Sequence, residues 1–321
     1  GIRLRVPGFC GYGRMAEQAE SSQTGQSQAE DGRTESAEAP DSAGGTEESV
    51  PEGSVRTNGG EVIALSTLEH QDENAASVVY FTSDISPEAM TEIYHALGEG
   101  LSGENIAVKL STGEPPASNY LDPALIADLV HEVDGTIVEN NTAYGGQRAS
   151  TAMHYQVAED HGFTEIADFV VLDEDGSVSL PAEGGTRLSE NLVGAHFPEY
   201  DCYLVLSHFK GHAMAGFGGA IKNISIGMAS QEGKCLIHTA GESHTSPWGG
   251  EQDPFTESMA EAGKSVVDAL DQACVDLVYA SQDDTASLIE RMESRNAVHV
   301  LEHGEEIGLG SRSYQMVSID G

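Results

Sequence analysis

Residues 208–223, HFKGHAMAGFGGAIKN, bring together several side chains that can do chemistry. His208 and His212 stand four residues apart, and Lys222 and Asn223 end the stretch. Imidazole rings bind metal ions and transfer protons near neutral pH. We therefore expect His208, His212 and Lys222 to be catalytic, with one of the two histidines acting as a metal ligand or general base.

The spacing of the two histidines allows two geometries. On a helix, residues four apart share a face and can hold one metal ion. The glycines at 211, 216, 218 and 219 instead favour a loop, in which the two rings can still converge on a metal or substrate. The alternative is a polar turn whose histidines hydrogen-bond to the backbone.

A second polar stretch, residues 230–250, contains His238 three residues after Cys235. These two can be a ligand pair or a nucleophile and its base, but we favour Cys235 as a small buried filler. His208, His212 and His238 are then the expected metal ligands. A divalent metal ion is the cofactor that they would hold, and its identity stays open.

Lysine is scarce in this chain, which has five. Lys109, Lys222 and Lys234 lie in apolar or glycine-rich surroundings, where a lysine has no obvious role in solubility. Together they predict a local anion site, whereas the alternative is ordinary pairing with nearby carboxylates. The stretch GFGGAIKN also resembles a phosphate cradle at a helix start, but it lacks the spacing of a P-loop or a dinucleotide fingerprint.

Short apolar segments alternate with helical periodicity through the middle of the chain. The patterns predict strands at 77–83, 105–111, 135–140, 166–173 and 200–209, and helices at 86–101, 122–133 and 148–163. Strands that are apolar throughout are typical of sheets buried on both faces. We therefore expect an α/β fold with a mostly parallel sheet and helices on both faces. After residue 254 the pattern turns helical, with one last strand at 314–320.

Three polar connections follow strands of this predicted sheet, at residues 112–120, 140–148 and 208–223. Ligands of open α/β sheets bind beyond the carboxyl ends of the strands, so we expect the three connections to meet at one site. Arg148 and the lysines would hold a carboxylate or phosphate there. The expected substrate-binding residues are Lys109, Asn141, Tyr144, Arg148, His154, Asn223 and Lys234.

The charge balance limits the partners. Fifty-three acidic residues face fifteen basic ones, for a formal net charge of −38. Such a surface repels phosphate backbones and anionic lipid, so we expect no nucleic acid partner. No apolar run is long enough to span a membrane. A small anionic molecule is the expected ligand.

Residues 14–60 are rich in Ser, Glu, Gln, Gly and Ala and have almost no large apolar side chain. Such a segment cannot bury enough surface to offset its chain entropy, so we expect a disordered acidic tether at 1–76 and a single α/β domain at 77–321. Tethers of this kind often join an exported bacterial domain to a membrane anchor. Cys10 would then carry a lipid, although the preceding VPGF fits a lipoprotein cleavage site poorly. A cytoplasmic and an exported location both stay open.

Five blocks of the chain resemble one known family. The blocks are VYFTSDISPEAMTEIYHAL, VKLSTGE, VENNTAYGGQRASTAMHYQVAEDHGF, HFKGHAMAGFGGAIKNISIGMASQEGK and ESRNAVHVLEHGEEIGLGSR. They are similar to the domain of unknown function 362 family, over about residues 77–320. That family is often described as iron–sulfur or ferredoxin-associated, so the resemblance implies a redox partner.

The cysteines depart from the family pattern. The chain has four, none in CxxC spacing, so it lacks a ligand set for a [4Fe–4S] cluster and we expect none. Many relatives carry closely spaced cysteines, and some carry a cysteine-containing stretch where Asp268 and Ala269 adjoin here. Either that stretch is deleted or a flexible piece is missing from this sequence.

Two functions follow from these observations. The first is a metal-dependent or redox-associated enzyme that acts on a small anionic substrate. The alternative is a non-catalytic module, carried on an acidic tether, that binds a small anion or a metal ion.

Overall fold

A computed structural model describes residues 50–98, 101, 103–116, 119–266, 272–282 and 285–320. The first 49 residues of the expected tether, including Cys10, lie outside the described residues. Asp268 and Ala269, where the family pattern is interrupted, also lie outside them.

The centre of the fold is a four-stranded parallel sheet. Its strand order is β6-β5-β4-β9, and neighbouring strands pair in parallel throughout. The two central strands are almost wholly buried, which explains why their sequences read as continuous apolar runs. The strands are β4 (Ile106–Lys109), β5 (Gly135–Glu139), β6 (Phe169–Val171) and β9 (Cys202–Val205).

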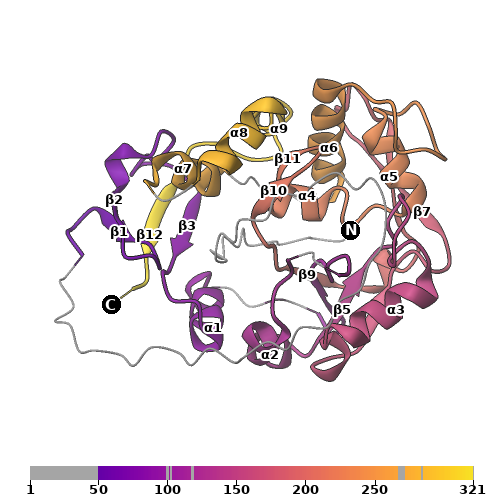
Figure 1. Cartoon of the computed structure of the whole chain (residues 1–321), viewed down its shortest axis with the longest axis horizontal. Helices are drawn as coiled ribbons and strands as arrows, with labels where there is room; N and C mark the ends of the chain where they lie inside the picture. Colours follow the sequence, from indigo (N-terminus) through magenta and orange to yellow (C-terminus); the bar gives the residue numbers. More distant parts are fainter. Residues whose placement is uncertain are drawn as a thin grey trace, which may run out of the picture.

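Helices cover both faces of this sheet (Figure 1). On one face, α2 (Pro123–Glu132) and α3 (Thr151–Asp160) pack against Val108 and Ile137. The opposite face carries α4 (Ala220–Ile224) and a hairpin of two antiparallel strands, β7 (Ser177–Pro181) and β8 (Glu190–Gly194). The expected α/β class, with a mostly parallel sheet between helices, is confirmed.

The expected helix starts are supported by their caps. Ser86 accepts a hydrogen bond from the Ala89 N–H at the start of α1 (Pro87–Ala96), which packs beside α2. Asp122 does the same for the Ala124 N–H at the start of α2, at 2.9 Å. Both caps precede a proline, whose missing N–H costs nothing at that position.

A second, smaller core lies beside the main sheet. The strand β3 (Val78–Phe81) pairs in parallel with β12 (Gln315–Ser318) rather than with the main sheet. A hairpin of β1 (Ser54–Arg56) and β2 (Val62–Ala64), followed by the 3-10 helix η1 (Leu65–Thr67), packs against this pair.

Residues 50–76 are folded, whereas the sequence analysis expected them to belong to a disordered tether. Val55, Ile63 and Leu68 are buried in the smaller core, so the ordered part of the chain begins well before Ser77. These side chains are isolated among polar residues, so no periodic pattern in the sequence identifies them. They become buried only because β3 and β12 supply the rest of the core. The division into domains stays a prediction.

The C-terminal part is helical, as expected. Among the described residues, no helix is both long and apolar enough to cross a membrane. The helices are α5 (Gln231–His238), α6 (Gln252–Val266), α7 (Gln272–Ala280), α8 (Ala286–Ser294) and α9 (His299–Glu306), and two further 3-10 helices are η2 (Phe163–Glu165) and η3 (Phe197–Glu199).

The glycine-rich stretch is a short hairpin rather than the expected loop. Its strands β10 (Lys210–His212) and β11 (Gly216–Gly218) pair antiparallel. Gly216 has a φ of +77°, and a Cβ added there would lie 2.4 Å from the Cβ of Ala297. Only glycine adopts this positive φ without strain and also leaves room for Ala297. The hairpin can therefore lie directly against the segment that follows α8.

Replacing Gly216 with alanine should lower the free energy of unfolding by about 2–5 kcal/mol, because backbone strain adds to overpacking. Gly308→Ala is a matched control, since Gly308 has the same φ of +77° but open space around its Cα. The control should cost only about 1–2 kcal/mol. Urea denaturation of both variants measures the difference, and equal losses would show that the contact with Ala297 does not matter.

Candidate functional site

A buried lysine and a buried glutamate end the two central strands. Lys109 is the last residue of β4 and is 0% exposed; Glu139 is the last residue of β5 and is 4% exposed. The Lys109 ammonium lies 3.5 Å from a carboxylate oxygen of Glu139 and donates to the Leu110 carbonyl at 2.7 Å. Burial lowers the pKa of Lys109, while Glu139 opposes that shift.

Arg148 joins two of the three expected connections. Its guanidinium contacts Glu139 at 3.1 Å and Glu114 at 3.1 Å, and donates to the Ser111 hydroxyl at 3.3 Å. Burial alone would raise the pKa of Glu139, but Lys109 and Arg148 lower it to about 2. Glu139 is therefore an anion that holds two cations at the carboxyl edge of the sheet.

Asn223 attaches the third connection to the same place. Its side-chain oxygen accepts from the Lys109 ammonium at 2.8 Å. Its amide nitrogen donates to the Leu206 carbonyl and to the Ser207 hydroxyl, both at 3.1 Å. The helix α4 is thereby fixed to the ends of β4 and β9. The three connections meet as the sequence analysis expected.

The end of β6 contributes a fourth group that the sequence analysis did not select. Asp173 accepts from the backbone N–H groups of Asn141 at 2.8 Å and Gln231 at 3.0 Å. Burial raises the pKa of Asp173, and nearby Lys234 opposes that shift. Lys234 is 5% exposed and donates to the Ala229 carbonyl, and its pKa falls to about 8 because of burial.

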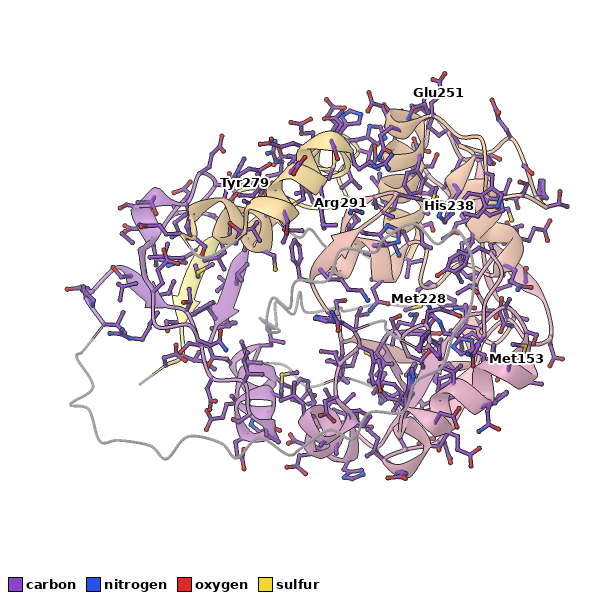
Figure 2. The ribbon with its side chains drawn as sticks, viewed as in Figure 1. Met153, Met228, His238, Glu251, Tyr279 and Arg291 are labelled. Atoms are coloured by element: carbon purple, nitrogen blue, oxygen red, sulfur yellow. The ribbon has the colours of Figure 1, made fainter. Side chains whose placement is uncertain are left out.

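Asn140 lies in the expected connection 140–148 but was not among the selected site residues. Its amide nitrogen donates to the carbonyls of Gly227 at 2.9 Å and Met228 at 3.2 Å, and Met228 lies in the interior of the molecule (Figure 2). Glu139, Asn140 and Asp173 all stand at the end of an apolar strand, which was the available signal. In a chain with 53 acidic residues, a single carboxylate does not stand out in the way that a lysine does.

Lys222 differs from the other lysines of the site. The residue is partly buried, and within the described part of the chain its ammonium has no hydrogen-bond or ion-pair partner. Burial, Lys210 and Arg148 lower its pKa to about 7. Four of the five lysines of the chain therefore influence one another's pKa in a region with few carboxylates. They are Lys109, Lys210, Lys222 and Lys234.

The backbone fixes the proton position on His212. The Nδ1 atom of His212 accepts from the N–H groups of Met214 at 3.2 Å and Ala215 at 3.1 Å. Burial and the nearby cation Lys222 lower the pKa of His212 well below its usual value, so the ring is neutral. A neutral ring whose Nδ1 accepts carries its proton on Nε2. The Nε2 atom of His212 is thus a hydrogen-bond donor.

His238 has the opposite arrangement. Its Nδ1 donates to the Lys234 carbonyl at 2.7 Å, so Nε2 holds the free lone pair. The ring stacks on Phe255 with centroids 4.9 Å apart, between α5 and α6 (Figure 2). Burial lowers the pKa of His238 to about 4, and Lys222 adds to the shift. His238 is a neutral ring that offers an acceptor.

Three other expected site residues, His154, Asn141 and Tyr144, differ in their burial and contacts. His154 is 0% exposed; its Nε2 contacts the Thr112 hydroxyl at 3.0 Å and its buried Nδ1 has no hydrogen-bond partner. Burial lowers the pKa of His154 to about 4. Asn141 donates to Thr151, and its buried side-chain oxygen has no hydrogen-bond partner. Tyr144 is 41% exposed beside Arg148.

The expected metal ligands do not form a cluster. Within the described residues, Glu174, Asp175 and His196 are the group that brings three potential ligand atoms within 4.8 Å of one another. His208, His212 and His238 are not such a group. His208 has a buried Nδ1 without a partner, whereas His212 has its lone pair engaged by backbone N–H groups. A divalent metal ion stays a prediction.

Removing the charge of Glu139 should destabilise the fold strongly. Glu139→Gln leaves Lys109 without its carboxylate and Arg148 with one partner fewer, at a cost of about 3–5 kcal/mol. Glu114→Gln is the matched control, because Glu114 is a quarter exposed and its loss should cost about 1 kcal/mol or less. Similar losses of unfolding free energy for the two variants would contradict the central role of Glu139.

Stability should fall as the pH drops from about 6.5 to 4. His154 and His238 have folded-state pKa values near 4, below the usual 6.5, so the unfolded chain binds more protons in this window. Each ring contributes up to about 1 kcal/mol per pH unit. Urea denaturation at pH 7 and pH 5 measures the slope, and His238→Gln should reduce it. An unchanged slope in that variant would contradict the assignment.

The residues of this site fall within a region that matches a known family. A family model described as a domain of unknown function, DUF362, matches residues 106–294. The structure of the lactate racemase apoprotein from Thermoanaerobacterium thermosaccharolyticum is similar at 19% identity, with a TM-score of 0.39 over 61% of this chain and 49% of that one. The chain thus spans about half the length of that protein. No curated protein matches the chain. Because the family model covers more than half of the 321 residues, the protein belongs to the DUF362 family.

Proposed function

We propose that the protein is an enzyme that acts on a small anionic molecule bound at the carboxyl edge of the four-stranded sheet. The single observation that carries the proposal is the Lys222 ammonium, which lacks a partner among the described residues although four lysines and Arg148 gather there. In a chain of net charge −38, surface carboxylates are plentiful, yet none pairs with this lysine in the described part. An anionic ligand would complete the charge balance.

The charges around Lys222 support the same conclusion. Lys109 and Arg148 share Glu139, Arg148 also contacts Glu114, and Lys234 lies near Asp173. Lys222 and Lys210 add further positive charge to this set. The positive field of the cluster would attract a carboxylate or phosphate into a place that burial shields from salt.

The two neutral histidines favour catalysis over binding alone. His212 offers an N–H and His238 offers a lone pair, and both rings lie within electrostatic reach of Lys222. His212 can donate a hydrogen bond and His238 can accept one, while a lysine of pKa near 7 can exchange its proton near neutral pH, so Lys222 is the group suited to general acid–base chemistry. The metal ion that the histidines predict and the redox partner that the family resemblance implies are not needed for this proposal and stay predictions.

Calorimetry with phosphate and oxalate tests the anion site. We expect Lys222→Gln to weaken binding about tenfold or more, because a charge-assisted contact is lost. The wild-type protein should bind more tightly at pH 6 than at pH 8, since Lys222 is protonated below about pH 7, and the variant should lose that dependence. Lys264→Gln, which removes the fifth lysine, is the control for net charge.

If neither anion binds, or if both variants weaken binding equally, Lys222 does not hold an anion and the proposal is wrong. A module that binds oxalate without turning over any related substrate would instead be the non-catalytic alternative.

A further inference from the structure

We propose that Glu174, Asp175 and His196 bind one divalent metal ion beside the end of β6, an edge strand of the main sheet. Glu174 and Asp175 lie in the turn directly after β6, and His196 lies between β8 and η3. The site shares no residue with the cluster around Lys222, so this inference is independent of the proposed function. One imidazole and two carboxylates suit a first-row ion such as Zn²⁺ or Mn²⁺.

The three side chains stand at the separations that one ion requires. The Nε2 atom of His196 lies 3.1 Å from Oδ2 of Asp175 and 3.7 Å from Oε1 of Glu174. All three atoms lie within 4.8 Å of one another. Ligand atoms that share an ion at about 2.0–2.2 Å stand about 3–4 Å apart, so small side-chain rotations are enough to complete the site.

The protonation of His196 directs a lone pair at these carboxylates. Its Nδ1 lies 2.8 Å from an oxygen of Glu199, and a carboxylate accepts hydrogen bonds, so Nδ1 carries the proton. The Nε2 atom is buried and makes no hydrogen bond to the described residues. A neutral ring thus points its Nε2 lone pair at two anionic oxygens, which repel it unless a cation lies between them.

A proton is the competing occupant of Nε2, because the hydrogen bond to Glu199 raises the pKa of His196. A protonated ring would donate from Nε2 to the nearest carboxylate oxygen. Oδ2 of Asp175 is near enough at 3.1 Å, yet Nε2 does not form a hydrogen bond with it. The three atoms are therefore arranged as ligands around a shared centre rather than as a donor and its acceptor.

Two further side chains orient the ligands. Glu199 fixes the ring of His196 through Nδ1. The hydroxyl of Tyr155 donates to Oε2 of Glu174 at 3.2 Å and accepts from the Val171 N–H at 3.4 Å. This contact holds one carboxylate oxygen of Glu174 and leaves Oε1 for the ion. Metal-binding histidines and carboxylates are commonly oriented by such hydrogen bonds from a second layer of residues.

The backbone already holds the two ligand segments together. The N–H of His196 donates to the Leu172 carbonyl at 3.0 Å, and that of Ala195 donates to the Gly176 carbonyl at 2.9 Å. Because the ligands are assembled by these bonds, little chain entropy is lost when an ion binds. Three protein ligands also leave coordination positions for water.

Metal titration of the full-length protein tests the inference. After treatment with EDTA, calorimetry with Zn²⁺ in excess Mg²⁺ should give a tight site, since Mg²⁺ occupies the non-specific acidic surface. His196→Ala should weaken that site about tenfold or more, because one of three protein ligands is lost. His244→Ala is the matched control. His244 is an exposed ring 2.6 Å from a single carboxylate, that of Glu232, and this variant should bind Zn²⁺ as the wild type does.

Asp175→Asn keeps the test decisive if His196→Ala does not fold, because Asp175 is 75% exposed and its charge is not needed by the core. This variant should also bind Zn²⁺ about tenfold more weakly, and the rise in melting temperature that Zn²⁺ gives the wild type should shrink. Unchanged binding in Asp175→Asn, equal weakening in His244→Ala, or no tight site would overturn the inference. A site lost in His208→Ala but kept in Asp175→Asn would overturn it in favour of the metal ligands that the sequence predicts.

Discussion

The site depends on one buried carboxylate, that of Glu139. It ends a central strand and lies 3.5 Å from the ammonium of Lys109 and 3.1 Å from the guanidinium of Arg148. A lone charge at this depth costs several kcal/mol, so each of the three groups requires the others. Through Arg148 this triad fixes the connection after β5, and through Lys109 and Asn223 it fixes α4. Glu139 therefore connects the ends of β4 and β5 to the segments that follow them, and Glu114 gives Arg148 a second carboxylate partner.

This arrangement divides the lysines into two kinds. Lys109 is compensated by Glu139 and by backbone oxygens, and it has a structural role at the strand end. Lys222 receives the repulsion of the surrounding cations without a partner of its own in the described part of the chain. Burial also lowers the pKa of Lys222 to about 7, because desolvation without a compensating ion pair favours the neutral amine.

The histidines show how backbone geometry determines chemical role. His212 and His238 have the same side chain and both remain neutral, yet one presents an N–H and the other a lone pair. The difference arises because the Nδ1 of His212 faces N–H groups of a turn, whereas that of His238 faces a helix carbonyl. In His212 the Nδ1 lone pair is already engaged by the N–H groups of Met214 and Ala215.

The sequence by itself determined the α/β class, the helix caps and the convergence of three polar connections, because apolar runs and capping residues are local signals. It also identified the lysines, which stand out in an acidic chain. Tertiary structure alone decided the partners: that Glu139 rather than another carboxylate holds Lys109 and Arg148, and that Lys222 is left without one. It also decided that Val55 and Ile63 are buried under β3 and β12. The physical reason is that burial and charge compensation depend on residues distant in the chain, which no local pattern records.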